Sequence, residues 1–233
     1  MSKKKVPWEE YLEKISDMLN TLSPHERTIL LNNISVVKFK KNDIIYKEGE
    51  LPSFLLCLIS GKVKIHKEGV GGRSQIVRVL GDTEYFGYRA YIDNQPFITG
   101  ASAFETCVIL KVPMSIIVNL IQQNPKLGWF FIQKLAHDLG QSDERTVSLT
   151  QKHIRGRLAE SLLFLKESYG LEADGSTLSI YLTREDLANL SNMTTANAIR
   201  TLSAFAAEKL VAIDGRKIKF INIPEIEKIS RIG

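Results

Sequence analysis

The spacing of apolar residues divides the chain into a helical beginning, a strand-rich middle and a helical end. Between positions 7 and 33 apolar residues recur at intervals of three and four, which predicts a helix from Trp8 to Leu22. Ser23 and Pro24 then cap and start a second helix. From Ile34 the pattern changes to short, β-branched and often alternating runs, which predict strands over 36–39, 44–46, 54–59, 63–66, 76–79 and 108–112. Short strands joined by Gly-rich turns are typical of an antiparallel β-barrel or jelly roll.

Helical spacing returns after Pro113. We predict a short helix over Met114–Gln123 and a long one that begins at Asn124-Pro125 and reaches to about Leu149. More than one face of the long helix is apolar, through Leu127, Trp129, Phe131, Ile132, Leu135, Ala136 and Leu139. A helix with two apolar sides packs on its own domain and on something else, and a parallel copy of itself is the favoured partner. Burial against a second element of the same chain is the alternative.

Two short helices joined by a turn are predicted over Thr183–Ala207. Thr183 is a good N-cap with Asp186 three residues later, and Ser191-Asn192 favour a turn. Thr194 opens the second helix, whose expected buried side is Ala198, Ile199, Leu202, Phe205 and Ala206. Thr195, Ala196, Asn197 and Arg200 then face outward. A short exposed helix led by Thr, Asn and Arg suits a DNA major groove.

The segment after these helices favours DNA binding over an ordinary helical hairpin with a solvated face. Two alternating runs, Val211–Ile213 and Lys217–Ile221, flank Asp214-Gly215, which predicts a β-hairpin. A helix-turn-helix followed at once by a small hairpin is a winged helix. Arg216, Lys217 and Lys219 on the hairpin would lie along the phosphate backbone. The helix over Ile154–Tyr169 begins this C-terminal domain.

Composition narrows the class of protein without identifying a partner. The 233 residues are 44% hydrophobic and 24% charged, as in soluble globular proteins, and the net charge is +5. Positions 151–233 carry 12 basic and 10 acidic residues, so bulk charge does not mark a DNA-binding half. Neither a membrane span nor a signal peptide is expected, which predicts a cytoplasmic protein. Cys57 and Cys107 lie in apolar runs and are expected to be buried free thiols rather than a disulfide.

Five segments, in this order and spacing, carry a resemblance to a known family. They read GELPSFLLCLISGKVKIHKEG, LGDTEYFGYRAYIDNQPF, ASAFETCVILKVP, GRLAESLLFL and TREDLANL…IRTLSAF. The chain resembles the cyclic-AMP receptor protein/fumarate-nitrate regulator (Crp/Fnr) family of bacterial transcription factors. The resemblance implies a homodimer that grips two half-sites of a roughly palindromic double-stranded operator, about 34 Å apart. RNA polymerase is a further expected partner.

These observations predict an α+β chain of three parts. An effector-sensing β-barrel domain with flanking helices covers 1–123, a dimerisation helix covers 124–150, and a winged-helix DNA-binding domain covers 151–233. The expected mechanism is a shift between two dimer arrangements, with a hinge near 151–153.

The barrel departs from the family's cyclic-nucleotide binders. Their short barrel helix begins Phe-Gly-Glu, where the glutamate holds the ribose hydroxyl, whereas this chain reads Phe86-Gly87-Tyr88. Their Arg-Ser pair for the cyclic phosphate is matched here by Phe97-Ile98. Burying a cyclic phosphate without such donors is costly, so we do not expect cyclic AMP as the effector. Two cysteines cannot supply a four-thiolate iron–sulfur site either.

The barrel is therefore expected to hold a different small molecule, a haem, or nothing. The resemblance places eight residues around this pocket: Gly87, Tyr88, Arg89, Phe97, Ile98 and Thr99, with Ser142 and Asp143 from the long helix. Plain barrel core is the alternative for the aromatic pair. His66 and His137 are the candidate haem ligands, and ordinary surface or core histidines are the alternative.

The second short helix departs from the family pattern as well. Relatives often present Arg/Glu-x-x-x-Arg, and here Ala196 stands at the glutamate position while Arg200 keeps the final arginine. Arginine gives a bidentate contact to guanine N7 and O6, so Arg200 is the main predicted base contact. Thr195 and Asn197 are expected to add base contacts. Thr183, Arg184 and Thr194, together with Arg216 and Lys217, are expected to touch phosphates.

The sequence is compatible with three classes of function. The leading hypothesis is a regulator whose barrel senses a signal, and a constitutively DNA-competent dimer is its variant. A barrel enzyme is disfavoured, because the four histidines fall in four segments and no catalytic triad, P-loop, zinc spacing or other metal set is present. A ligand-binding module without DNA binding is the last alternative.

Overall fold

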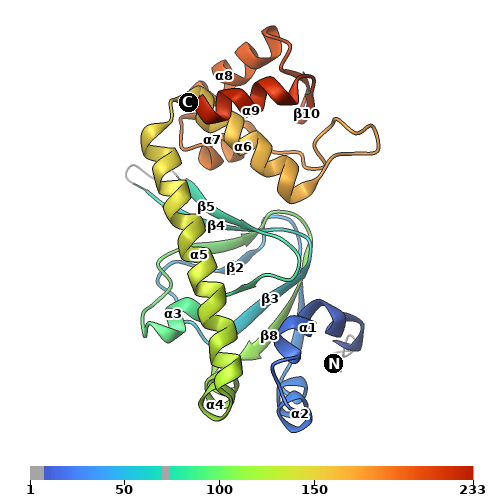
Figure 1. Cartoon of the computed structure of the whole chain (residues 1–233), viewed down its shortest axis with the longest axis vertical. Coiled ribbons are helices and arrows are strands. Elements are labelled where there is room, and N and C mark those ends of the chain that lie inside the picture. The colour runs from blue at the N-terminus through green and yellow to red at the C-terminus, as the bar shows by residue number, and fades with distance from the viewer. Residues whose placement is uncertain (1–7, 70–73, 233) are drawn as a thin grey trace. The chain divides into compact units, whose positions relative to one another are not determined.

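The computed structural model describes residues 8–69 and 74–232, and they form two compact units (Figure 1). The first unit contains the described residues up to Glu68 together with Val77–Leu139. The second contains the chain from Gly140 onward and the described part of 69–76. The first seven residues of the predicted barrel domain lie outside the described residues, and the three-part division of the chain stays a prediction.

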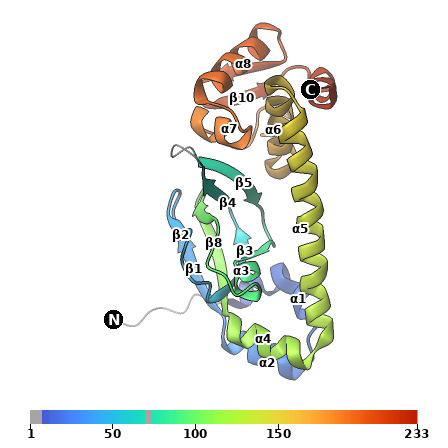
Figure 2. The same ribbon diagram turned by 90° about the vertical axis from the view of Figure 1, so that its left-hand side faces the viewer.

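The first unit is built on two four-stranded sheets, which confirms the predicted jelly roll. One has the order β1-β8-β3-β6 and the other β2-β7-β4-β5; Figure 2 shows β1, β8 and β3 side by side. Buried aliphatic and aromatic side chains fill the space inside the sheets. All six predicted strands are present: β1 (Ser35–Phe39), β2 (Ile44–Tyr46), β3 (Phe54–Ser60), β4 (Val63–Glu68), β5 (Ser74–Leu80) and β8 (Cys107–Pro113).

Two strands were not predicted. β6 (Tyr85–Phe86) is too short to show any periodicity. β7 (Gly100–Ala103) consists of small residues in place of the usual β-branched ones. The reason is crowding: a Cβ on Gly100 would lie 2.9 Å from His66 Nε2, and Ala101 and Ala103 are fully buried.

The first predicted helix is wrong in type and length. The chain forms a 3-10 helix, η1 (Trp8–Ile15), followed by one turn of α-helix, α1 (Ser16–Leu19). It leaves the helix at Asn20, although Leu22 is still buried. The next helix, α2 (Pro24–Asn32), begins as predicted, with a capping box between Ser23 and Glu26.

The two helices after the jelly roll are confirmed as α4 (Met114–Gln123) and α5 (Pro125–Gln151). Leu127 and Phe131 of α5 are buried in the first unit's core. Trp129, Ile132 and Leu139 remain 61%, 54% and 63% exposed, so Leu139 belongs to the outer face of α5. Within the described residues, no helix is both long enough and apolar enough to span a membrane.

The second unit is a winged helix, as predicted. Its elements are α6 (Ile154–Tyr169), α7 (Arg184–Leu190), α8 (Thr195–Ala207), β9 (Val211–Asp214), β10 (Lys217–Phe220) and α9 (Ile223–Ile232). α9 was not predicted, although Ile223, Ile226 and Ile229 recur at intervals of three and Pro224 lies in its first turn. Two contacts join the end of α5 to Glu160 of α6. Ser148 donates a hydrogen bond to Glu160, and Lys152, the residue after α5, has its Nζ 3.2 Å from Glu160 Oε1.

Candidate nucleic-acid interface and effector pocket

The helix-turn-helix is defined by hydroxyl caps on both of its helices. Thr183 Oγ1 accepts the Asp186 N–H at 3.0 Å, and Thr194 Oγ1 accepts the Asn197 N–H at 3.2 Å. Between them Asn192 takes a left-handed conformation with φ +49°, which a short polar side chain tolerates. The Thr183 hydroxyl also donates to Asp186 Oδ2 at 2.8 Å, so its hydrogen is committed inside the protein rather than directed to a phosphate.

The outer face of α8 differs from the prediction at one residue. Thr195, Ala196 and Arg200 are exposed, and Asn197 is half-buried. Ile199, predicted to be buried, is 46% exposed, while Thr201 is buried instead. The buried line runs through Ala198, Leu202 and Phe205 at intervals of four and three, and Ile199 lies one residue to its side.

Arg200 is oriented by its own helix. Its Nη2 donates to Asn197 Oδ1 at 2.5 Å, which holds the guanidinium along the helix toward the N-terminus of α8. An arginine fork has five N–H donors, so the remaining groups can still reach a base edge. Asn197 is thus a positioning partner of Arg200, and its predicted base contact competes with this bond.

The wing is fixed to the first helix of the motif. Arg184 Nη2 donates to the Gly215 carbonyl oxygen at 2.7 Å, at a turn where Gly215 has φ +56°. Lys217 Nζ lies 5.4 Å from the centre of the Tyr181 ring, a cation–π contact. Arg216 is exposed beside the turn.

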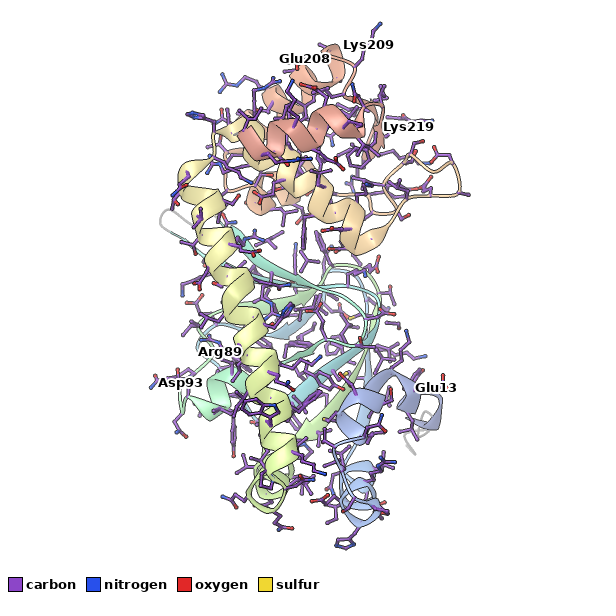
Figure 3. All side chains as sticks on the ribbon, viewed as in Figure 1. Glu13, Arg89, Asp93, Glu208, Lys209 and Lys219 are labelled. Atoms are coloured by element: carbon purple, nitrogen blue, oxygen red, sulfur yellow. The ribbon has the colours of Figure 1, made fainter. Side chains whose placement is uncertain are left out.

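The third basic residue of the wing has an acidic neighbour in its own chain. Lys219, labelled in Figure 3, is 3.4 Å from the Asp174 carboxylate. Hydrogen bonds from the Thr177 and Ser176 backbone and from the Thr177 hydroxyl hold the pKa of Asp174 well below its usual range. Both side chains are about half exposed, so this ion pair is weak and the phosphate contact of Lys219 stays a prediction.

Two of the eight predicted pocket residues, Tyr88 and Phe97, are buried in different core clusters. Tyr88, the first residue of α3 (Tyr88–Ile92), is buried in the core cluster that contains α5 residues, with its ring 5.0 Å from that of Phe131. Phe97 is buried in the separate cluster inside the sheets and stacks on Tyr46 at 3.8 Å. The aromatic pair is therefore split between two packed clusters, as the plain-core alternative requires.

Other predicted pocket residues lie near Tyr46. The Thr99 side chain hydrogen-bonds to Tyr46, which stacks on Phe97, and Arg89 is close enough for its charge to oppose the rise in the pKa of Tyr46. Gly87 has φ +83° and precedes α3, in which Arg89 is an exposed residue, labelled in Figure 3. Ile98 is 49% exposed, and its predicted place in the pocket lining stays a prediction. Ser142 and Asp143 are exposed residues of α5 in the second unit.

An ion-pair cluster beside these aromatics was missed by the sequence reasoning. Arg78 Nη1 lies 2.6 Å from Asp138 Oδ2, and its Nη2 lies 3.3 Å from Glu84 Oε1. The Tyr88 hydroxyl is buried and makes no hydrogen bond within the part of the chain that the structure describes. Burial raises the pKa of Tyr88, and Asp138 raises it further while Arg78 lowers it, so this hydroxyl is near the ion pair. Burial also raises the pKa of Tyr46 to about 12.

The histidines and cysteines suggest no metal centre. His66 Nδ1 is buried without a hydrogen-bond partner among the described residues, and burial lowers the pKa of His66. Residues 8–69 and 74–232 contain no group of three His, Cys, Asp or Glu side chains able to hold a metal ion. Cys57 and Cys107 are free and buried, as predicted, and burial raises the pKa of both thiols, that of Cys107 to about 11.

Comparison with protein families assigns a domain to each half of the chain. The model of the cyclic nucleotide-binding domain matches residues 36–124. The model of the Crp-like helix-turn-helix domain matches residues 156–231. Together the two matches cover more than half of the sequence.

Curated relatives align over most of the chain. The CRP-like cAMP-activated global transcriptional regulator of Mycobacterium tuberculosis is 23% identical over 211 residues, which cover 90% of this chain and 93% of that protein. The anaerobic regulatory protein of Aggregatibacter actinomycetemcomitans is 24% identical, with 90% of this chain and 82% of that protein covered. The global nitrogen regulator of Nostoc is 24% identical over 78% of this chain and 83% of its own length.

Solved structures share the fold. A transcriptional regulator of the Crp/Fnr family from Eubacterium rectale superposes with a TM-score of 0.80 at 18% identity, over 98% of this chain and all of that one. FixK2 from Bradyrhizobium japonicum gives a TM-score of 0.74 at 18% identity, over 84% of this chain and 96% of that one. The family consists of transcription regulators rather than enzymes. The chain, with its cyclic nucleotide-binding fold and its Crp-like helix-turn-helix, belongs to the Crp/Fnr family of transcription regulators.

Proposed function

We propose that the chain is a homodimeric, sequence-specific DNA-binding regulator whose jelly-roll domain responds to a small molecule other than cyclic AMP. The observation that carries the DNA-binding part is the outer face of α8. It presents Arg200, oriented by Asn197 at 2.5 Å, next to a wing that Arg184 fastens to α7. A guanidinium held in this way on an exposed helix suits the guanine edge in a major groove.

The dimer is supported by the outer face of α5. Trp129, Ile132, Ala136 and Leu139 are all exposed and recur at intervals of three, four and three, which is the seam of a coiled coil. Three large apolar side chains in water on one helix face are a feature of interaction surfaces. A parallel second copy buries the same residues on both helices and places two α8 helices on one DNA duplex.

The effector proposal rests on the side chains that stand where cyclic-nucleotide binders of the family place their ligand contacts. Tyr88 replaces the glutamate and packs on Phe131, and the nearby carboxylate of Asp138 is already paired with Arg78 at 2.6 Å. Phe97 and Tyr46 stack against each other inside the sheets. The same packing favours the variant in which DNA binding needs no effector. RNA polymerase and a cytoplasmic location remain further expectations.

Selection of bound duplexes from a random pool at a fixed salt concentration, with and without a small-molecule cell extract, tests the function. We expect a palindromic consensus with a guanine in each half-site. On the selected duplex Arg200→Ala is expected to cost about 1–3 kcal/mol per half-site, or roughly 5- to 150-fold for each, and to relax the guanine preference. Lys228→Ala, which also removes one exposed positive charge but lies on α9, is the control.

The outcomes separate the alternatives. Enrichment without ligand supports the constitutive variant, and enrichment only after addition of a small-molecule cell extract supports an effector. No enrichment in either case, or equal binding by Arg200→Ala, would contradict a DNA-reading role for α8.

A further inference from the structure

Ile199 is an apolar residue on the outer face of α8, and this face reads DNA in the proposed function. It is 46% exposed, although α8 has a well-defined buried line through Ala198, Leu202 and Phe205. The isoleucine therefore contributes little to the fold on its exposed side. The isoleucine side chain also lacks any hydrogen-bonding group with which to contact a phosphate or a polar base edge.

The neighbours of Ile199 extend this apolar surface. Thr195 and Ala196 precede it by four and three residues, so both lie on the same face one turn earlier, and both are exposed. Arg200 follows directly and is exposed as well. The face thus consists of methyl groups from three side chains beside one guanidinium.

Charge decides which partner suits this surface. Arg200 follows Ile199 directly on α8, and Arg184 of α7 and Arg216 and Lys217 of the wing add positive charge to the same domain. Positive charge on this domain favours an anionic partner over an apolar protein face, and double-stranded DNA is such a partner. In the major groove the apolar feature of an unmodified base pair is the C5-methyl group of thymine.

We propose that Ile199 reads the C5-methyl group of a thymine next to the guanine that Arg200 contacts, with Ala196 on the same apolar face. This proposal rests on the proposed DNA-binding function and adds a second recognised base, a thymine, to the guanine assigned to Arg200. Because Ala196 stands where relatives often carry glutamate, the side chain at this position makes no hydrogen bond to a base. Discrimination there depends on a methyl contact.

The size of the effect follows from the burial of a single methyl group. Such burial is worth about 0.8 kcal/mol, which corresponds to about fourfold in affinity. A symmetric operator contains the contact twice, so removing both methyl groups is expected to weaken binding by roughly fifteenfold.

Deoxyuridine provides the test, since it differs from thymidine only by the missing methyl group. Each thymine of the selected operator is replaced in turn, symmetrically in both half-sites, and affinity is measured by fluorescence anisotropy. We expect one thymine beside the recognised guanine to show the roughly fifteenfold loss with the wild-type protein. Ile199→Ala is expected to bind the thymine and deoxyuridine duplexes equally.

Two controls make the result specific. Arg200→Ala is expected to bind more weakly overall and still to prefer the thymine duplex. A duplex in which 5-methylcytosine replaces the sensitive thymine is expected to bind more tightly than one in which cytosine replaces it. This difference is expected with the wild-type protein only. Thermal unfolding of Ile199→Ala checks that this exposed substitution leaves the fold intact.

Three outcomes would overturn the proposal. If the wild-type protein binds every deoxyuridine duplex as tightly as the thymine duplex, it makes no methyl contact. If Ile199→Ala still loses affinity on deoxyuridine substitution as the wild type does, another residue makes the contact. Both of these leave the proposed function standing if Arg200→Ala is impaired. Failure to enrich any duplex, or an unimpaired Arg200→Ala, would overturn the proposed function and this inference together.

Discussion

Leu139→Ala tests the dimer seam of α5 with a magnitude that follows from the structure. Full burial of a leucine side chain is worth about 1.5–3 kcal/mol. Because Leu139 is 63% exposed in the single chain, its burial by a second copy is worth about 1–2 kcal/mol. The substitution occurs twice in a homodimer, so the expected loss is about 2–4 kcal/mol, or roughly 30- to 1000-fold in the dimer dissociation constant. Alanine and leucine are both strong helix formers, so α5 itself is preserved.

Sedimentation equilibrium at several protein concentrations measures that constant directly. Leu51→Ala is the matched control, since it makes the same chemical change at a leucine that is 76% exposed but lies in the loop between β2 and β3. We expect the control to dimerise like the wild type. A wild-type protein that is monomeric at micromolar concentration, or a Leu139→Ala variant with an unchanged constant, would refute the reasoning.

Three further predictions follow from the first unit and from α5. Cyclic AMP at 1 mM should change the melting temperature by no more than about 1 °C. A ligand present at 100 times its dissociation constant would add about 2.7 kcal/mol to the free energy of unfolding, or roughly 5–10 °C to the melting temperature of a chain of this size. A shift of that size would restore cyclic AMP as the effector. Gly140→Ala should stabilise α5 by about 0.5–1 kcal/mol, because a Cβ there meets no atom within 4 Å; Gly128→Ala, whose Cβ would lie 3.3 Å from Ile121 Cγ2, should gain less in the same urea titration. Burial lowers the pKa of His66, ahead of the smaller effects of Lys64, Glu68 and Glu48, so the unfolded chain binds more protons as pH falls below about 6.5. The wild type should therefore lose stability from pH 7.5 to 5.5 relative to His66→Gln in parallel urea titrations, and equal losses would assign the pH dependence to other groups.

The sequence predicted those parts of the fold that depend on periodicity. α4, α5 and α6 and the six predicted strands of the jelly roll carry apolar residues at helical or strand spacing. β7 lacks such a pattern, since a Cβ at Gly100 would meet His66 and the fully buried Ala101 and Ala103 are small as well. α9 was overlooked, although Ile223, Ile226 and Ile229 recur at intervals of three.

The candidate sites were harder to predict, because they depend on which side chains meet. Arg78 and Asp138 are 60 positions apart in the sequence, and nothing in either local pattern indicates a 2.6 Å contact. Tyr88 and Phe97 are close in sequence yet pack into separate core clusters. Ile199 shows the limit of helix spacing itself, since a shift of one residue, about 100° around the helix, decides between core and surface. The capping residues, the helical spacing and the following hairpin located the predicted DNA-binding helix, but the direction of each side chain required the structure.

The central claim is that two chains read two half-sites of one duplex. The most direct measurement is native mass spectrometry of the protein on its selected operator, compared with the same operator carrying five extra base pairs between the half-sites. We expect two chains on one intact operator at protein concentrations below the dissociation constant for a single half-site. On the lengthened duplex, whose half-sites face opposite sides of the helix, that complex should disappear. One chain per operator, or equal occupancy of the two duplexes, would contradict a dimer that holds both α8 helices in fixed register.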